Sequence, residues 1–417
     1  MSSESSYAKD PYREQLAFGQ RTQILRTRRG LTRDQLGGLV GRSGSWVKAV
    51  ETGRLKTPAL PMVLRIAEVL RVRDLSDLTG DQSLRVSLFA GPGHPRFAAV
   101  REALNALQLG PGHDAPPDAE HLSARLARAW RARHSAPNHR DVIGSLLPDL
   151  IRDARDAVRR AGTVADRKAA QAALAEVYFL AQFFCAYQPD APLVWRVAER
   201  GMTAAQDSED PHTIGLAAWL TTQAHRERAH LDAADAVTLE TLRYLEPMLP
   251  DAGTDVRAVA GALTVEAGLT AARRGETGTA WRYWDQARAL AESLPAGYFH
   301  PVTSFSRAVM GAHAVTVAVE LHAGGESARQ AARAEADAIP SRPRRARHRI
   351  EQARAYHLDG QPDAALATLA QAHEVAPETV QYNGYARRII LEEADAKSPA
   401  RRRRASELAS RLGLLTA

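Results

Sequence analysis

Apolar residues in the first 80 positions recur at helical spacings that turn residues interrupt. The pattern predicts four short helices, over 18–29, 32–40, 43–51 and 61–70. Thr32 and Ser43, which have side chains typical of N-caps, begin the second and third helices. A glycine follows each of the first three helices, namely Gly30, Gly41 and Gly53. The N-terminal region is therefore expected to be a small helical unit.

The chain from Asp118 onward is a succession of helices rich in Ala, Leu and Arg, with short breakers between them. Fourteen helices are expected, over 118–134, 138–161, 164–187, 192–206, 211–229, 232–247, 253–274, 277–293, 299–323, 326–338, 342–359, 362–374, 378–395 and 399–412. No strand-like alternation stands out. Regular pairing into about seven antiparallel hairpins indicates an α-solenoid, so the predicted fold class is all-α.

Some of these hairpins resemble tetratricopeptide repeats (TPRs). In the clearest one, Gly360 precedes a helix with small or apolar residues at Ala365, Leu369 and Ala372, and Pro377 follows it. Small residues at this spacing let paired helices approach closely. The resemblance implies a TPR-like superhelix that dimerises and binds a peptide, another ligand or a protein partner.

Two segments rich in glycine and proline suggest domain boundaries. They lie at 91–95 and 110–117, and one amphipathic helix with Phe97, Val100, Leu104 and Leu107 lies between them. The expected organisation is a flexible arm over 1–14, a compact unit over 15–80, a linker with one helix over 81–117 and the repeat domain over 118–417.

Positive charge is concentrated at the N-terminus. The chain has a formal net charge of +7, and residues 1–80 hold 14 Lys and Arg against 8 Asp and Glu. A basic head on a nearly neutral remainder is typical of a protein that binds a polyanion. The chain uses far more Arg than Lys, so the uneven distribution is more informative than the abundance of arginine.

The segment from Arg33 to Glu51 resembles the helix-turn-helix of the Cro/cI repressor family, also called the XRE family. Gly37 supplies the small residue of the first helix, and Gly41 supplies the turn glycine. Val47 and Val50 supply the apolar residues that hold the second helix against the first. In this family the second helix lies in the major groove of DNA.

The resemblance implies roles for individual residues. Those expected to face base edges are Gly44, Ser45, Trp46, Lys48 and Ala49, and those expected at phosphates are Arg33, Ser43, Arg54 and Lys56. Arg26 and Glu51 occupy positions that form a structural ion pair. Since Gly44 and Ala49 offer no side-chain hydrogen bonds, direct readout is expected to depend on Ser45 and Lys48. Trp46 either contacts a thymine methyl or sugar, or anchors the domain.

Two further groups of residues in the repeat region have alternative interpretations. The aromatic cluster Trp281, Trp284, Tyr298, Phe299 and Phe305 either lines a ligand pocket or forms repeat core, and core is favoured. Two arginine runs, at 342–349 and 401–404, are either solvated helix faces or sites for an anionic ligand, an acidic peptide or phosphate. The solvated face is favoured.

Catalytic and metal-binding motifs are not found in the sequence. HExxH, GxSxG, GxGxxG and phosphate-loop patterns are absent, and Cys185 lies in an apolar helix. We therefore expect neither enzyme activity nor a cofactor or metal. A single cysteine and the lack of a signal peptide or membrane-spanning segment favour a cytoplasmic, nucleoid-associated protein.

These observations predict a sequence-specific transcription regulator that binds double-stranded DNA, is a homodimer on an inverted repeat, and senses a peptide or small molecule or binds a protein through its repeats. The alternative is a TPR-type protein-interaction scaffold with a vestigial helix-turn-helix. The operator, the direction of regulation and the ligand do not follow from the sequence.

Overall fold

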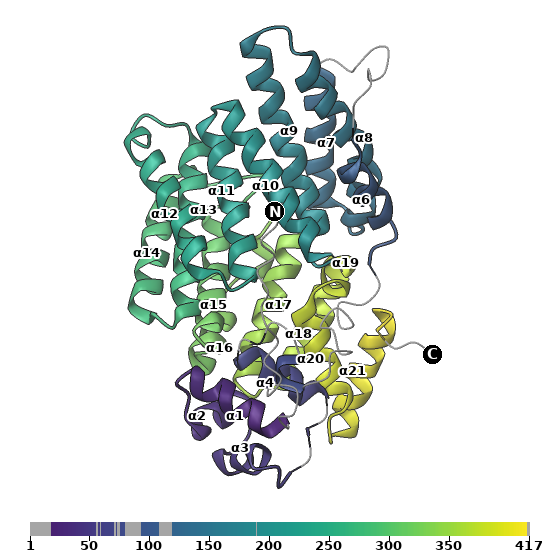
Figure 1. Cartoon of the computed structure of the whole chain (residues 1–417), viewed down its shortest axis with the longest axis vertical. Helices are drawn as coiled ribbons and strands as arrows, with labels where there is room; N and C mark the ends of the chain where they lie inside the picture. Colours follow the sequence, from purple (N-terminus) through teal and green to yellow (C-terminus); the bar gives the residue numbers. More distant parts are fainter. Residues whose placement is uncertain are drawn as a thin grey trace, which may run out of the picture. The chain divides into compact units, whose positions relative to one another are not determined.

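Every regular element that the computed structural model describes is helical (Figure 1). The described residues are 18–55, 57–58, 60–70, 72, 76–79, 93–107, 119–188 and 190–414. The chain divides into two compact units, unit 1 over Met1–Gly91 and unit 2 over Pro92–Ala417. The boundary falls in the range 81–117 that the sequence suggested as a linker, and the arm expected over 1–14 lies outside the described residues.

Unit 1 is a small helical domain. Its helices are α1 (Phe18–Arg28), α2 (Arg33–Leu39), α3 (Gly44–Glu51), α4 (Leu60–Val69) and α5 (Ser76–Thr79). The four helices predicted here are present, with bounds that differ by one or two residues. Apolar side chains from α1 to α5 share one core, which includes Phe18, Leu36, Val47, Val50, Ile66 and Leu78.

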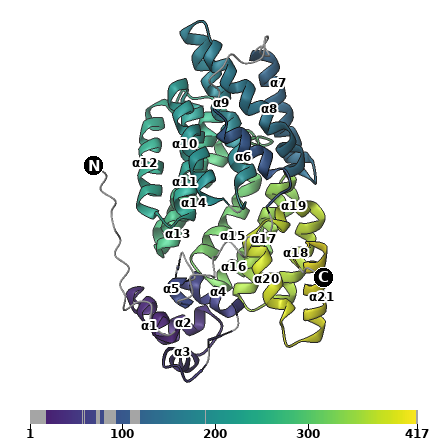
Figure 2. The ribbon, with the colours of Figure 1, turned by 45° about the vertical axis from the view of Figure 1, so that its right-hand side comes forward.

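Unit 2 consists of consecutive antiparallel helices (Figure 2). They are α6 (Phe97–Asn105), α7 (Ala119–Ser135), α8 (His139–Arg160), α9 (Val164–Cys185), α10 (Ala191–Ser208), α11 (Pro211–Glu227), α12 (Leu231–Leu245), α13 (Thr254–Arg274), α14 (Thr277–Ser293), α15 (Met310–Glu320), α16 (Gly324–Arg333), α17 (Arg342–Leu358), α18 (Pro362–Val375), α19 (Pro377–Gln381), α20 (Gly384–Ala394) and α21 (Pro399–Arg411).

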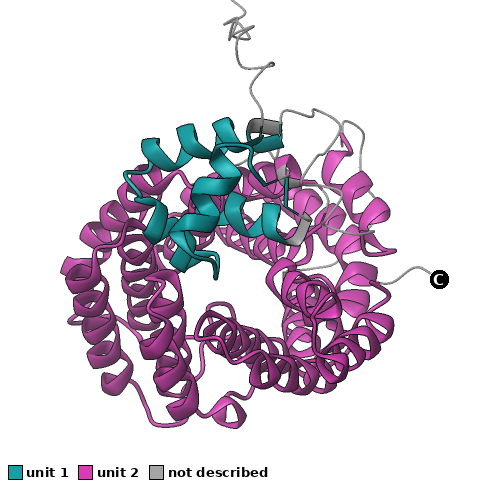
Figure 3. Cartoon of the chain, turned by 90° about the horizontal axis from the view of Figure 1, so that it is seen from below, with its two compact units in different colours: residues 1–91 teal, residues 92–417 magenta. Residues whose placement is uncertain are grey.

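The helices of unit 2 form a TPR-like α-solenoid. Each helix of the series α7, α9, α11, α13, α15 and α17 contacts the next one, and the helices between them pack on their neighbours in sequence. Viewed from below, unit 2 is arranged around a central opening (Figure 3). The prediction of an all-α protein with a helix-turn-helix unit and a solenoid is therefore confirmed.

The solenoid closes on itself, because α17 contacts α7. His134 Nε2 on α7 donates to the carbonyl oxygen of Pro301 at 2.7 Å, and its Nδ1 forms a hydrogen bond of 2.8 Å with Ser341 Oγ. Glu378 on α19 accepts a hydrogen bond of 2.6 Å from the backbone N–H of Arg140 at the start of α8. Segments more than 200 residues apart in the sequence thus meet and enclose the interior of unit 2.

Three of the predicted helices differ from the structure. The helix predicted over 326–338 ends at Arg333, and a separate 3-10 helix covers Ala336–Ala338. Residues 299–306 form a turn rather than the start of a helix, because the backbone N–H of His300 donates to the carbonyl of Phe305 and Ser304 has a φ of 61°. The helix predicted over 378–395 is divided into α19 and α20. Asn383 separates them, since its side chain accepts from the N–H of Ala386 and caps α20.

Helix α6 lies in the range that was expected to be a linker. Its apolar residues Phe97, Val100 and Leu104 are buried in the core of unit 2. The expectation that Leu107 continues this apolar side is wrong, because α6 ends at Asn105 and Leu107 is exposed. The guanidinium of Arg155 on α8 donates to the carbonyl oxygens of Ala103, Leu104 and Ala106 at the C-terminal end of α6. These bonds supply acceptor partners that a helix end lacks within itself. Helix α6 is therefore a structural part of unit 2.

Candidate nucleic-acid interface

Helices α2 and α3 are joined by a tight turn that depends on local capping. Thr32 and Gln35 form a capping box at the start of α2, and Ser43 Oγ accepts from the N–H of Trp46 at 3.2 Å at the start of α3. Gly41 in the turn has a φ of +70°. A Cβ atom at Gly37 would lie 2.7 Å from the carbonyl oxygen of Arg42, so glycine is required where the turn crosses α2.

The two sides of α3 differ in burial. Val47 and Val50 are buried in the core of unit 1, whereas Ser45 and Lys48 are exposed. Trp46 is partly buried and packs against that core. Of the five residues expected to face bases, Ser45 and Lys48 thus offer exposed polar groups.

Ala49 does not occupy the exposed side of α3. It is only 4% exposed, so the expectation that it faces a base edge is wrong. It lies directly before the buried Val50, and because it is itself buried it does not add to the exposed surface of α3. Gly44 lies against Asp34 of α2, whose carboxylate would clash with any added Cβ atom. Packing within the domain therefore explains why this position is a glycine.

A buried ion pair connects α1 with α3, at the two residues for which it was expected. Arg26 Nε donates to Glu51 Oε1 at 2.5 Å, and the side chain of Glu51 is fully buried. The structure adds a second partner, since Arg33 Nε donates to Glu51 Oε2 at 2.7 Å. Arg33, expected at phosphate, therefore also has a structural contact, and its side chain remains 37% exposed.

Basic residues flank the exposed side of α3. Arg54 is exposed beyond its C-terminal end, and Lys56 lies outside the described residues. Arg42 is exposed in the turn before α3, where its guanidinium carbon lies 5.7 Å from the ring centroid of Trp46. Sequence reasoning missed Arg42. The signal was a basic residue directly before the N-cap Ser43, where a phosphate oxygen would meet both the side chain and the N-terminus of a helix.

Comparison with known proteins supports this description of unit 1. Residues 17–78 match a family model described as a helix-turn-helix domain. Unit 1 contains a helix-turn-helix domain. A solved structure of Bacillus thuringiensis PlcR in complex with the peptide PapR7 and DNA is similar over 66% of this chain and 94% of that chain, with 11% identity and a TM-score of 0.28. No curated protein matches the chain.

The aromatic residues proposed for a ligand pocket are distributed over several contacts in unit 2. Trp281 and Trp284 pack edge to face on α14, and Trp284 Nε1 donates to the carbonyl of Met310 at 3.1 Å. Phe305 is fully buried against Gly261 of α13. Tyr298 OH donates to Asp255 Oδ1 at 2.5 Å. The two tryptophans lie together, but Phe305 is core and is not available to a ligand.

Phe299 lies apart from the tryptophan pair. Its ring packs edge to face on His134 of α7, with 5.5 Å between ring centroids.

Across the part of the chain that the structure describes, no helix is long and apolar enough to span a membrane. The same residues contain no group of three or more His, Cys, Asp or Glu side chains placed to hold a metal ion.

Proposed function

We propose that the chain is a sequence-specific DNA-binding transcription regulator of the Cro/cI (XRE) type. The observation that carries this proposal is a helix-turn-helix domain whose α3 has Ser45 and Lys48 exposed while Val47 and Val50 are buried. Helix α3 enters the major groove, where Lys48 Nζ donates to guanine O6 or N7 and Ser45 supplies a second polar contact.

Contacts to the DNA backbone come from the residues around α3. Arg42 and Arg54 are exposed on either side of this helix and neutralise phosphates. Ser43 lies at the N-terminus of α3, where backbone N–H groups and the helix dipole favour a phosphate oxygen. Arg33 has the weakest role here, because its Nε is already bonded to Glu51.

The regulator acts as a homodimer on an inverted repeat. One α3 helix exposes few polar groups, so two copies are needed for a site of useful length. The two half-sites lie about one helical turn apart, roughly 34 Å centre to centre.

Unit 2 holds the two copies together and responds to a peptide or small-molecule signal. The signal acts by binding one arrangement of the dimer more tightly than the other. A chromosome-binding regulator of this kind is cytoplasmic and nucleoid-associated.

A protein-interaction scaffold is the second candidate. The observation that favours it is the low polar content of α3, where Gly44 has no side chain and Ala49 is buried. In that case the TPR-like unit binds a protein partner and the helix-turn-helix domain is vestigial.

Selection of bound fragments from a random DNA pool tests the regulator against the scaffold. Full-length protein is incubated with the pool at near-physiological salt, and bound DNA is sequenced over several rounds. We expect enrichment of an inverted repeat whose half-sites contain guanine. A pool that remains random after selection, together with a protein complex that is independent of salt, would favour the scaffold.

A further inference from the structure

The interior of unit 2 contains a cavity of about 250 Å³. Residues of α7, α8, α9, α11, α13, α15, α17 and α19 line it, together with the turn over Val302–Ser304. The contact between α7 and α17 closes the solenoid around it. This volume lies just below the range of about 300–1,000 Å³ that is typical of small-molecule pockets. The cavity therefore suits a small molecule rather than a folded partner.

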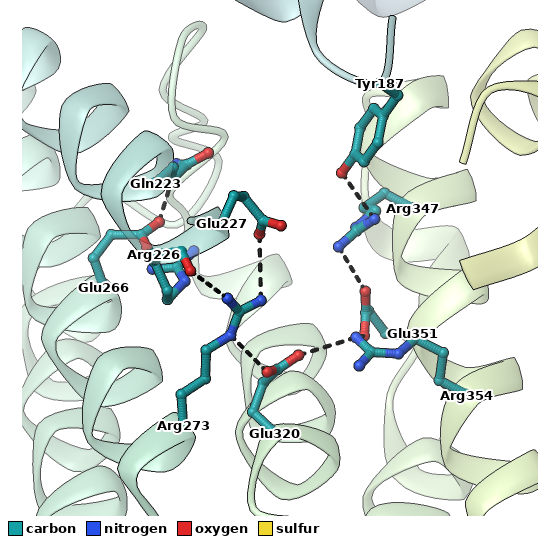
Figure 4. A network of polar contacts seen from close by, with 10 residues as sticks. All are labelled: Tyr187, Gln223, Arg226, Glu227, Glu266, Arg273, Glu320, Arg347, Glu351 and Arg354. Carbon is teal, nitrogen blue, oxygen red and sulfur yellow. Dashed lines mark hydrogen bonds and ion pairs between the residues drawn. The ribbon is translucent and has the colours of Figure 1, made fainter. Parts of the chain in front are cut away.

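The acidic groups of this cavity are neutralised by arginines (Figure 4). Glu266 pairs with Arg226 and also accepts from Gln223 at 3.0 Å. Glu351 pairs with Arg347 at 2.8 Å. Glu227 pairs with Arg273, which lies beyond the cavity lining. Each carboxylate in the lining of the cavity therefore already has an arginine partner.

Arg133 and Arg344 also line the cavity, from α7 and α17, without such a partner. Among the described residues, no carboxylate lies within ion-pair distance of either guanidinium. Arg133 Nη1 is buried without a hydrogen-bond acceptor, and its guanidinium carbon lies 3.9 Å from the ring centroid of Phe183. Two guanidinium groups that form no ion pair with a described residue therefore line one cavity.

The electrostatics agree with this geometry. Burial lowers the pKa of Arg133 to about 9, and the nearby charges of Arg140 and Arg344 lower it further in the same direction. Burial and the charge of Arg347 lower the pKa of Arg344 to about 10, although the charges of Glu351 and Glu266 oppose the shift. Both groups remain charged at neutral pH. The buried Nη1 atom of Arg133 lacks an acceptor, which is costly for a charged group, so an anion beside it would relieve an existing penalty.

Neutral donors and an apolar wall complete the cavity. Asn383 is 1% exposed and its Nδ2 atom has no hydrogen-bond acceptor, and Thr379 Oγ1 is also unpartnered. Apolar side chains form other parts of the lining, namely Ile143, Phe183, Trp219 and Leu269. The lining thus combines cationic and neutral hydrogen-bond donors with an apolar surface.

We propose that this cavity binds a small organic anion, with its carboxylate or phosphate group between Arg133 and Arg344 and its apolar part against Phe183 and Trp219. The sequence favoured a solvated helix face for the arginine run at 342–349. That interpretation is wrong for Arg344 and Arg347, which line the cavity. The role of this anion as the signal of the regulator rests on the proposed function. Its binding to the cavity is a separate property of unit 2.

Calorimetric titration of the full-length protein tests the site with four probes, in the absence of DNA. The probes are phenylacetate, its uncharged counterpart phenylacetamide, acetate and inorganic phosphate. We expect one phenylacetate to bind per chain, roughly tenfold or more tightly than phenylacetamide, because the charged group has charge-assisted hydrogen bonds to gain. Tighter binding of phosphate than of acetate would assign a phosphorylated ligand, and the reverse would assign a carboxylate.

Arg133→Met and Arg344→Met remove the charges and keep most of the apolar stem. Each is expected to weaken binding of the charged probes at least tenfold and to leave the melting temperature unchanged or raised. Arg131→Met is the matched control, since Arg131 is exposed on the same helix as Arg133. The affinity of this variant for the charged probes is expected to equal that of the wild type.

The proposal is overturned if none of the charged probes binds the wild type at millimolar concentration, or if phenylacetamide binds as tightly as phenylacetate. Binding that both methionine variants retain would also overturn it. The comparison of acid and amide needs no variant, so it holds even if a variant fails to fold. None of these results depends on DNA, and failure here is distinguishable from failure of the proposed regulator.

Discussion

Arg26 and Glu51 are joined by two hydrogen bonds, of 2.5 Å from Nε to Oε1 and 3.3 Å from Nη2 to Oε2, which connect α1 to α3. Glu51 is the last residue of α3, and Arg26 Nη1 also donates to the carbonyl of Leu31 at 2.6 Å. The pair thus fixes the C-terminal end of the helix that we propose to enter DNA.

Glu51→Ala is expected to destabilise unit 1 strongly. The change leaves Arg26 and Arg33 without their shared acceptor, and breaking a buried ion pair costs roughly 3–5 kcal/mol. Hydrogen exchange of the full-length protein, followed in peptides from residues 18–70, measures the loss of protection. Arg28→Ala is the control, because Arg28 is exposed on the same helix as Arg26. Unchanged protection in Glu51→Ala would show that the pair contributes little to folding.

Arg54→Ala is expected to weaken binding to all DNA sequences to a similar extent. Arg54 is exposed beyond α3 and is assigned to a phosphate, which carries no sequence information. The slope of log affinity against log salt should fall in magnitude by about one unit. Fluorescence anisotropy with labelled DNA over a range of salt measures both effects. A change confined to one sequence would instead place Arg54 at a base.

The stability of unit 2 is expected to fall as the pH decreases below about 6.5. Burial lowers the pKa of His300 to about 3, and the neighbouring His212 lowers it further, whereas Asp255 opposes the shift. Below its ordinary pKa near 6.5, His300 binds a proton in the unfolded chain but not in the folded one. His300 therefore contributes a decrease in the free energy of unfolding of up to about 1.4 kcal/mol per pH unit between pH 6.5 and 3.

Urea unfolding at pH 6.5, 5.5 and 4.5 measures this dependence. His300→Gln should have a shallower decrease than the wild type, because glutamine does not titrate. His230→Gln changes an exposed histidine and serves as the control. Equal slopes in the wild type and His300→Gln would contradict the assignment to His300.

Phe305→Ala is expected to destabilise unit 2 by about 3–5 kcal/mol, the range for large-to-small changes of a buried aromatic residue. Phe305 is fully buried against Gly261, so the change leaves an internal void. Thermal unfolding of the full-length protein measures the loss. If the variant unfolds like the wild type but binds the anionic probes with a different affinity, Phe305 would instead be part of a ligand site.

Local sequence signals predicted unit 1 well, because the caps at Thr32 and Ser43 and the turn at Gly41 act within a few residues. The helix limits depend on those signals, and so does the placement of Lys48 on α3. The burial of Ala49 was not predicted, since it depends on how α3 packs against α1 and α2 and not on spacing within α3. The second partner of Glu51, Arg33, likewise depends on side-chain packing.

The sequence predicted the helix hairpins of unit 2 but not the contacts between distant helices in its interior. The hairpins follow from repeating apolar spacing, but the closure of the solenoid depends on contacts between α7 and α17, which are far apart in the sequence. Arg133 and Arg344 face one cavity only because of that closure. No spacing within either helix distinguishes them from solvated arginines such as Arg131.

Repeating the DNA selection with the wild type and Lys48→Ala tests the central claim most directly, namely that α3 reads DNA sequence. Lys48 is exposed, so its change should leave unit 1 folded. We expect the wild type to enrich one inverted repeat. Lys48→Ala should lose roughly 1–3 kcal/mol of discrimination at one guanine per half-site while it keeps its affinity for unrelated DNA. A wild type that enriches no sequence, or a variant that enriches the same repeat with the same preference, would contradict the claim.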